Sequence, residues 1–290
     1  MESDYIKAGK IAAGALEFGA SLIKKDALLL EMTNRIEERI FKNGGRLAFP
    51  INISINHVAA HNTVMPDDKN VFHENDLVKL DIGVHVNGFI ADTATTIDLS
   101  GKNKEIVMAS REALNAALRI SRPGVKAREI GMEIHEKITS FGFSPIKNLS
   151  GHMLNEYKVH GEITIPNYDN GDNTELKEGM AIAIEPFATT GEGIVIEGKP
   201  SGIYRLEKKK AIRDANARRA LDFIEKEFKT LPFSKRSLNI PMRDFILNLL
   251  EKEGIIYQYP QLVERSKGIV SQAEHSVIIK EKPIVTTRIS

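Results

Sequence analysis

The chain contains neither cysteine nor tryptophan among its 290 residues. The absence of cysteine excludes disulfide bridges, thiolate metal sites and cysteine nucleophiles. A metal site must therefore use aspartate, glutamate and histidine, which favour hard or borderline divalent ions. The sequence also lacks a long uncharged apolar run, so no membrane-spanning helix is expected. Its first residues, MESDYIKAGK, carry no apolar signal-peptide core, and we expect a cytoplasmic protein.

The sequence also lacks an excess of either charge, since 40 basic and 39 acidic residues give a formal net charge of +1. This balance argues against a broad nucleic-acid-binding surface. A basic run at 205–219 has two interpretations, a solvated helix face or a contact with ribosomal RNA. The hydrophobic content of 42% is ordinary for a globular chain of one large domain or two smaller ones. Nothing in the sequence requires a dimer, so we expect a monomer.

The most informative segment is residues 77–99, LVKLDIGVHVNGFIADTATTIDL. Apolar side chains alternate with other residues up to Asn87-Gly88, and Asn-Gly between two such runs is a strong β-hairpin signal. The alternation gives the first strand one apolar face and one face that carries an aspartate. We therefore predict two antiparallel strands joined by a two-residue turn.

This hairpin predicts the beginning of a metal site. A two-residue turn sets Gly83 opposite Asp92 and Asp81 opposite Ala94. The two aspartates then lie on one face as diagonal neighbours, with backbones roughly 7–8 Å apart. Two acids in one small volume repel each other and raise each other's pKa unless a cation lies between them.

Helix and strand patterns organise the rest of the chain. Asp26 is the expected N-cap of the second of four helices, which we predict at 4–23, 27–42, 103–121 and 126–141. Strands are expected at 47–56 and 180–189, and two closing strands near the end. Residues 207–260 break the pattern with a long charged helix at 208–229 and another at 241–253. We predict a catalytic domain formed by 1–206 and 261–290, with an inserted helical subdomain at 207–260.

Three further residues interrupt apolar strands where an unpaired charge would be costly to bury. Glu185 ends MAIAIE, Glu274 opens EHSVII, and His152 lies in SGH. With the two aspartates they form a plausible two-metal site, whose ions lie ~3.5–4 Å apart in such centres. Considered alone, Glu185 or Glu274 could instead be an acid at the end of a strand that forms a salt bridge.

The motifs LDIGVHVNGFIADTA, SGH, IAIEPF and AEHSVII, in that order, resemble the methionine aminopeptidases of the pita-bread fold. NHVAAH, YKVHG and the helical insert are similar to the type II enzymes, in a minimal archaeal-like form. The resemblance implies an α+β fold. Its curved, mainly antiparallel sheet is covered by two helix pairs, and the inserted subdomain is winged-helix-like.

The resemblance also implies a role for each candidate ligand. Asp81 would chelate one metal ion, and Asp92 and Glu274 would bridge both ions. His152 and Glu185 would complete the other site. The implied cofactor is a pair of divalent ions, and cobalt, manganese, iron and zinc all accept such ligands.

The catalytic residues implied by the resemblance are Glu185, His160 and His61. Glu185 would take a proton from the metal-activated water and pass it to the leaving amine, as general base and then acid. His160 would hydrogen-bond the scissile carbonyl oxygen. His61 would contact the scissile amide nitrogen and the residue after methionine.

A methionine side-chain pocket is implied at positions that are mostly apolar or aromatic. A flexible thioether suits such a slot. Without the resemblance, Phe49 and Phe187 could equally be ordinary core residues. The implied substrate-binding set is Phe49, His61, Val159, His160, Phe187 and Tyr259.

The expected function is removal of the N-terminal methionine from nascent chains and peptides when the second residue is small. An Xaa-Pro peptidase of the same fold is one alternative. Such relatives usually carry an additional N-terminal domain, and only about 80 residues precede Asp81. A non-catalytic RNA- or protein-binding relative is the other alternative, and the presence of all five ligand residues argues against it.

Overall fold

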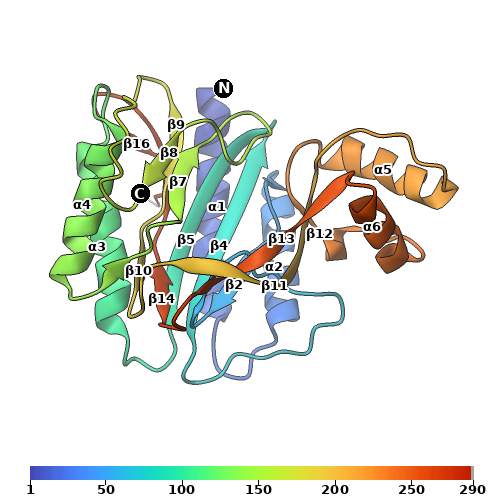
Figure 1. The fold of residues 1–290 in the computed structure, drawn as a ribbon, viewed down its shortest axis with the longest axis horizontal. Helices are drawn as coiled ribbons and strands as arrows, with labels where there is room; N and C mark the ends of the chain where they lie inside the picture. Colours follow the sequence, from blue (N-terminus) through green and yellow to red (C-terminus); the bar gives the residue numbers. More distant parts are fainter. Residues whose placement is uncertain (289–290) are drawn as a thin grey trace.

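Antiparallel sheets form the centre of the molecule, and two pairs of helices pack against them (Figure 1). The structure is a computed structural model, and it describes residues 1–288. All strand pairings between the named strands of these residues are antiparallel. The α+β class predicted from the sequence is therefore confirmed.

The two helix pairs lie where the apolar periodicity predicts them. One pair comprises α1 (Glu2–Leu22) and α2 (Leu29–Lys42), and the other α3 (Lys104–Ile120) and α4 (Ala127–Ser140). The predicted start of the second helix is wrong, because its N-cap is Leu28 and not Asp26. Asp26 lies in a turn with a φ of 64°, and its N–H donates to the Phe72 carbonyl, 2.8 Å away. The chain therefore turns before the helix begins.

The first pair covers the sheet that contains the predicted hairpin. This sheet consists of β1 (Arg46–Leu47), β2 (Asn52–Ile55), β4 (Leu77–Val86) and β5 (Phe89–Asp98). The strand expected at 47–56 is divided at Pro50, since proline has no N–H for a ladder hydrogen bond. Buried aliphatic side chains such as Ile36, Ile53 and Leu80 fill the layer between helices and sheet.

The second pair packs on sheets from the later part of the chain. One sheet has the order β16-β15-β9-β7-β8 and another the order β14-β10-β6. Their bounds are β6 (Ser144–Pro145), β7 (Ser150–Met153), β8 (Thr164–Pro166), β9 (Ala181–Ile184), β10 (Phe187–Thr189), β14 (Val270–Gln272), β15 (His275–Ile278) and β16 (Ile284–Val285). The strand expected at 180–189 is interrupted at Glu185-Pro186, so Glu185 lies between two strands.

The sequence does not predict the longest strand, β11 (Val195–Leu206). This strand lies in the order β12-β11-β13-β3, together with β3 (Val58–Ala60), β12 (Phe233–Ser234) and β13 (Ile256–Glu264). Pro200 and two glycines obscure its pattern in the sequence. The pairing of β11 with β13 shifts register on both sides of Pro200, and such irregularities accommodate a proline inside a sheet.

Beyond β11 the chain forms a small helical module at one side of the molecule (Figure 1), and its Arg236 contacts Asn34 and Glu37 of α2. It contains α5 (Ala215–Glu227), the 3-10 turn η1 (Lys235–Ser237) and α6 (Arg243–Lys252). The helix predicted at 208–229 starts later, because the Asp214 side chain caps it by accepting from the N–H groups of Asn216 and Ala217. The module has its own apolar cluster, and its division from the catalytic domain stays a prediction.

No helix within residues 1–288 combines the length and the apolar character needed to cross a membrane.

Candidate metal centre and substrate pocket

The hairpin has the predicted register. Gly83 pairs with Asp92, Asp81 with Ala94, and the turn residue Asn87 has a φ of 52°. Position 83 has no room for a side chain, because a Cβ atom there would lie 2.2 Å from Cε1 of Phe49. The glycine therefore allows the Phe49 ring to lie directly against the strand beside the two aspartates.

Three other segments bring the remaining candidate ligands to this face. Glu274 lies between β14 and β15, and its main chain forms a bridge with Ala94 of β5, with a 3.0 Å hydrogen bond from the Glu274 N–H. His152 lies on β7 opposite Ala183 of β9. Glu185 directly follows β9. The β5–Glu274 bridge thus joins the earlier and later sheets where the acids meet.

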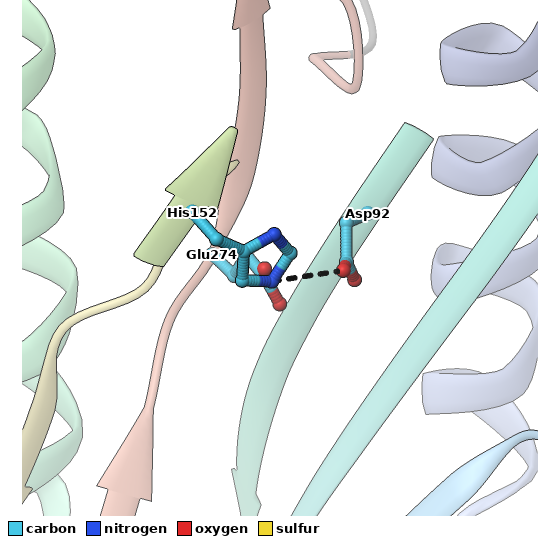
Figure 2. Close-up of side chains that lie close together, drawn as sticks. All are labelled: Asp92, His152 and Glu274. Atoms are coloured by element: carbon cyan, nitrogen blue, oxygen red, sulfur yellow. Dashed lines mark ion pairs between the residues drawn. The ribbon is translucent and has the colours of Figure 1, made fainter. Parts of the chain in front are cut away.

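Asp92, His152 and Glu274 converge, and one ligand atom from each lies within 4.8 Å of the others (Figure 2). The Nε2 atom of His152 is 3.8 Å from Oδ2 of Asp92 and 3.7 Å from Oε1 of Glu185. Oδ1 of Asp81, Oδ1 of Asp92 and Nδ1 of His152 are buried without a hydrogen-bond partner. The unpaired oxygens of Asp81 and Asp92, together with Nε2 of His152, which faces the acids, fit a divalent cation.

The electrostatics also favour a cation. Burial raises the pKa of Asp81 to about 7. Burial, followed by the charges of neighbouring acids, raises the pKa values of Asp92, Glu185 and Glu274 well above their ordinary range. Burial, followed by His160, lowers the pKa of His152 to about 3, which keeps the imidazole neutral as a ligand must be. Four carboxyl groups so close together, two buried and two partly buried, become favourable as anions only with compensating positive charge.

His61 and His160 flank this cluster. The rings of His160 and His152 are 4.4 Å apart, and the rings of His61 and Tyr259 are 5.3 Å apart. Burial lowers the pKa of His61 to about 4, with His160 as the next cause, and burial also lowers the pKa of His160. Both imidazoles are therefore neutral at pH 7, and each carries one N–H donor. His61 has a φ of 57°, an uncommon conformation that often occurs at functional sites.

All eleven site residues predicted from the sequence line one cavity of about 220 Å³. The acids and histidines form one part of its wall. Phe49, Val159 and Phe187 are buried and contribute apolar wall, and Tyr259 is partly exposed. The predicted residues are Phe49, His61, Asp81, Asp92, His152, Val159, His160, Glu185, Phe187, Tyr259 and Glu274.

Sequence reasoning missed several residues at this site. Asn52 lines the cavity and pairs with Asp81 across β2 and β4, and its buried Oδ1 has no hydrogen-bond partner. The side-chain amide of Gln272 lies 3.5 Å from the carboxyl groups of Asp81, Glu185 and Glu274. Arg205 donates from Nη1 to the Tyr259 hydroxyl over 3.2 Å. The alternation in NISIN and the two-residue spacing in QAE are signals that could have found Asn52 and Gln272.

Comparison with known proteins identifies the family. The pattern that describes metallopeptidase family M24 matches residues 3–217. A methionine aminopeptidase of Pyrococcus abyssi is 44% identical, over 97% of this chain and 97% of that protein. One of Thermococcus onnurineus is 46% identical, over 97% of this chain and 98% of that protein.

Comparison with solved structures supports the same assignment at the level of fold. The crystal structure of a methionine aminopeptidase from Thermotoga maritima matches with a TM-score of 0.73 at 22% identity, covering 100% of this chain and 98% of that one. At this identity the likeness shows the fold alone. The pita-bread fold expected from the sequence is thereby confirmed, and the chain belongs to metallopeptidase family M24.

Proposed function

We propose that this chain is a metal-dependent aminopeptidase that removes the N-terminal methionine from peptides and new proteins whose second residue is small. One observation carries the proposal. A single cavity is lined by four carboxyl groups, of which Asp92 and Glu274 are buried and Asp81 and Glu185 partly buried, together with three histidines and an apolar wall, in a chain 44% identical to a methionine aminopeptidase. A small second residue is the finer part of the proposal and follows from the family resemblance.

The residues that would hold the metal are Asp81, Asp92, His152, Glu185 and Glu274. Asp92 and Glu274 would hold both ions, the role that the family resemblance implies, and an oxygen of each lies in the same small volume as a His152 nitrogen. Asp81 is a diagonal neighbour of Asp92 in the hairpin and would serve the other ion. When bound, a pair of divalent ions supplies Lewis-acid chemistry, which polarises a carbonyl group and makes water a stronger acid. Cobalt, manganese, iron and zinc are all compatible with these donors.

Proton transfer is assigned to Glu185. Its carboxyl group lines the cavity and lies 3.7 Å from His152. It would accept a proton from the attacking water and deliver it to the amine that leaves. This order satisfies the proton balance of amide hydrolysis, because one water is consumed and the new amine gains the proton.

The neutral imidazoles of His160 and His61 would orient the substrate. The N–H of His160 would donate to the scissile carbonyl oxygen as negative charge develops there. His61 would contact the scissile amide nitrogen and the second residue. The methionine side chain would lie against Phe49, Val159 and Phe187, whose apolar surfaces suit a thioether.

Hydrolysis of Met-Ala-Ser and of an Ala-Pro peptide, each with and without added Mn²⁺, tests the proposal. We expect Mn²⁺-dependent release of methionine and little cleavage of Ala-Pro. Preferential cleavage of Ala-Pro would instead support an Xaa-Pro peptidase. Inert peptides together with metal-free purified protein would support the non-catalytic alternative.

The finer predictions are a monomer in the cytoplasm, and the basic run 205–219 has two interpretations, a solvated helix face or a contact with ribosomal RNA. Arg205, Lys209 and Lys210 are paired with Glu207, Glu225 and Glu253, which favours a solvated surface over RNA contact. Reversing the charges of Lys208 and Arg213 tests the alternative. Weaker ribosome binding with unchanged tripeptide hydrolysis would support RNA contact, and unchanged ribosome binding would rule it out.

A further inference from the structure

Gln272 is a neutral residue in contact with most of the acids of the metal centre. It ends strand β14, and 1% of its surface is exposed. Its side-chain Nε2 lies 3.5 Å from Oδ2 of Asp81, 3.5 Å from Oε2 of Glu185 and 3.5 Å from Oε2 of Glu274. These acids come from three separate segments of the chain, so one amide group contacts all three segments.

The chemistry of these contacts determines what the amide contributes. An amide NH₂ group has two donors and faces three carboxylate oxygens here. A separation of 3.5 Å is longer than the usual 2.7–3.2 Å of a strong hydrogen bond. The NH₂ group therefore acts as a shared partial positive charge more than as the donor of three full bonds. The opposite orientation of the amide would direct its oxygen at three other oxygens and is unfavourable.

The main chain of Gln272 is held firmly, which fixes the origin of its side chain. The Thr96 hydroxyl donates to the Gln272 carbonyl over 2.7 Å and accepts from the Gln272 N–H over 2.8 Å. Across the sheet, Gln272 pairs with Phe187, two residues after Glu185. The amide therefore occupies a defined position relative to β5 and to Glu185 without a contribution from any bound ion.

We propose that Gln272 is a positioning residue for the metal centre. Its NH₂ group orients the carboxyl groups of Asp81, Glu185 and Glu274 and lowers the cost of ionising them when metal binds. Gln272 is not among the described residues that line the cavity, so it would act on the acids and not on the substrate. The inference rests on the proposed function, because it takes these acids as metal ligands.

Metal binding to the stripped protein tests this role directly. Gln272→Met keeps the length and bulk of the side chain but removes the donors. Calorimetric titration with Mn²⁺ should show binding weakened about 10–100-fold, the usual effect of losing a partner of metal ligands. Gln272→Asn keeps an amide but withdraws it by one methylene group, so we expect a smaller loss in the same direction. This variant also keeps the test decisive if Gln272→Met does not fold.

Gln258→Met is the matched control. The Gln258 amide donates to the Tyr204 hydroxyl over 2.8 Å, and this residue is not among those lining the cavity. Its loss should leave the Mn²⁺ affinity unchanged. Wild-type affinity in both Gln272 variants, or an equal loss in Gln258→Met, would overturn the inference.

A second readout separates positioning from damage to the catalytic residues. Turnover of Met-Ala-Ser by Gln272→Met should recover to within about threefold of wild type at saturating Mn²⁺, because the change acts on metal affinity. Turnover that stays low at full occupancy would contradict a role limited to metal binding. Absence of methionine release by the wild-type protein would refute the proposed function. The calorimetric comparison of Mn²⁺ affinities would still test the positioning role of Gln272.

Discussion

At the scale of single residues, Glu185 is expected to be both ligand and proton carrier. Glu185→Gln preserves shape but removes the charge and the basic oxygen. We expect the kcat for Met-Ala-Ser at saturating Mn²⁺ to fall about 10²–10⁴-fold, the usual contribution of general acid–base catalysis. Metal content measured on the same sample separates loss of the base from loss of the ions. A kcat within tenfold of wild type at full occupancy would show that Glu185 is not the base.

His61 gives the opposite expectation, a catalytic loss without metal loss. Its ring packs on Tyr259, and its backbone has a φ of 57°. His61→Ala should lower kcat on the order of 10²-fold, because the ring that contacts the scissile amide nitrogen and the second residue is lost. Metal content should stay near that of the wild type. His57→Ala is the matched control, since His57 is not among the described residues lining the cavity. Loss of metal in His61→Ala would mean that His61 is a ligand.

There is a physical reason why the sequence predicts some residues of the metal centre and misses others. Asp81, Glu185 and Glu274 stand out in the sequence because an acid inside an apolar strand needs compensation. Asn52 and Gln272 are neutral amides, whose burial costs less than that of a charge, so their residue type gives a weaker signal. The structure shows their place directly, since Asn52 pairs with Asp81 and the Gln272 amide faces three acids.

At the scale of elements, the hairpin was predictable to the residue because Asn87-Gly88 fixes the turn and alternation fixes the faces. The sequence does not predict strand β11, because Pro200 interrupts its alternation of apolar and polar residues and its pairing with β13 is irregular. The sequence predicts the start of α5 too early, because the charged residues after β11 are compatible with a helix. The capping hydrogen bonds of Asp214 determine where it begins.

The hairpin turn also predicts a pH dependence of stability. His85 near the end of β4 is 8% exposed, and its Nδ1 accepts from the Gly88 N–H over 3.2 Å. Burial, then the charges of Lys229 and Arg46, lowers the pKa of His85 from 6.5 to about 4. Between these values the unfolded state binds more protons, so the folded state loses stability as the pH falls. The expected loss from this residue between pH 7 and pH 5 is about 2 kcal/mol.

Urea unfolding of wild type and His85→Gln at both pH values measures this contribution. Other groups destabilise both proteins in acid, and the difference between the two proteins isolates His85. We expect the wild type to lose about 2 kcal/mol more than the variant between pH 7 and pH 5. Equal losses would show that His85 does not titrate in this window.

At the scale of the whole molecule, the candidate ligands come from both halves of the chain. Asp81 and Asp92 belong to the sheet under α1 and α2, whereas His152 and Glu185 belong to the sheets packed against α3 and α4. The sequence predicts both helix pairs and thus the α+β class. It does not predict that β11 and β13 extend from the cavity wall into the helical module, because that pairing joins residues far apart in sequence.

Ligands drawn from both halves make the ions a cross-link, so metal removal should lower the stability of the whole protein. Binding at 100 times Kd adds about 2.7 kcal/mol to the free energy of unfolding. For a chain of this size we expect Mn²⁺ to raise Tm by about 5 °C or more above that of the chelated protein. His152→Ala keeps the hairpin acids but removes the ligand from β7, so its Mn²⁺-induced shift should be at most half that of the wild type. An undiminished shift in this variant would place the stabilising ion elsewhere in the protein.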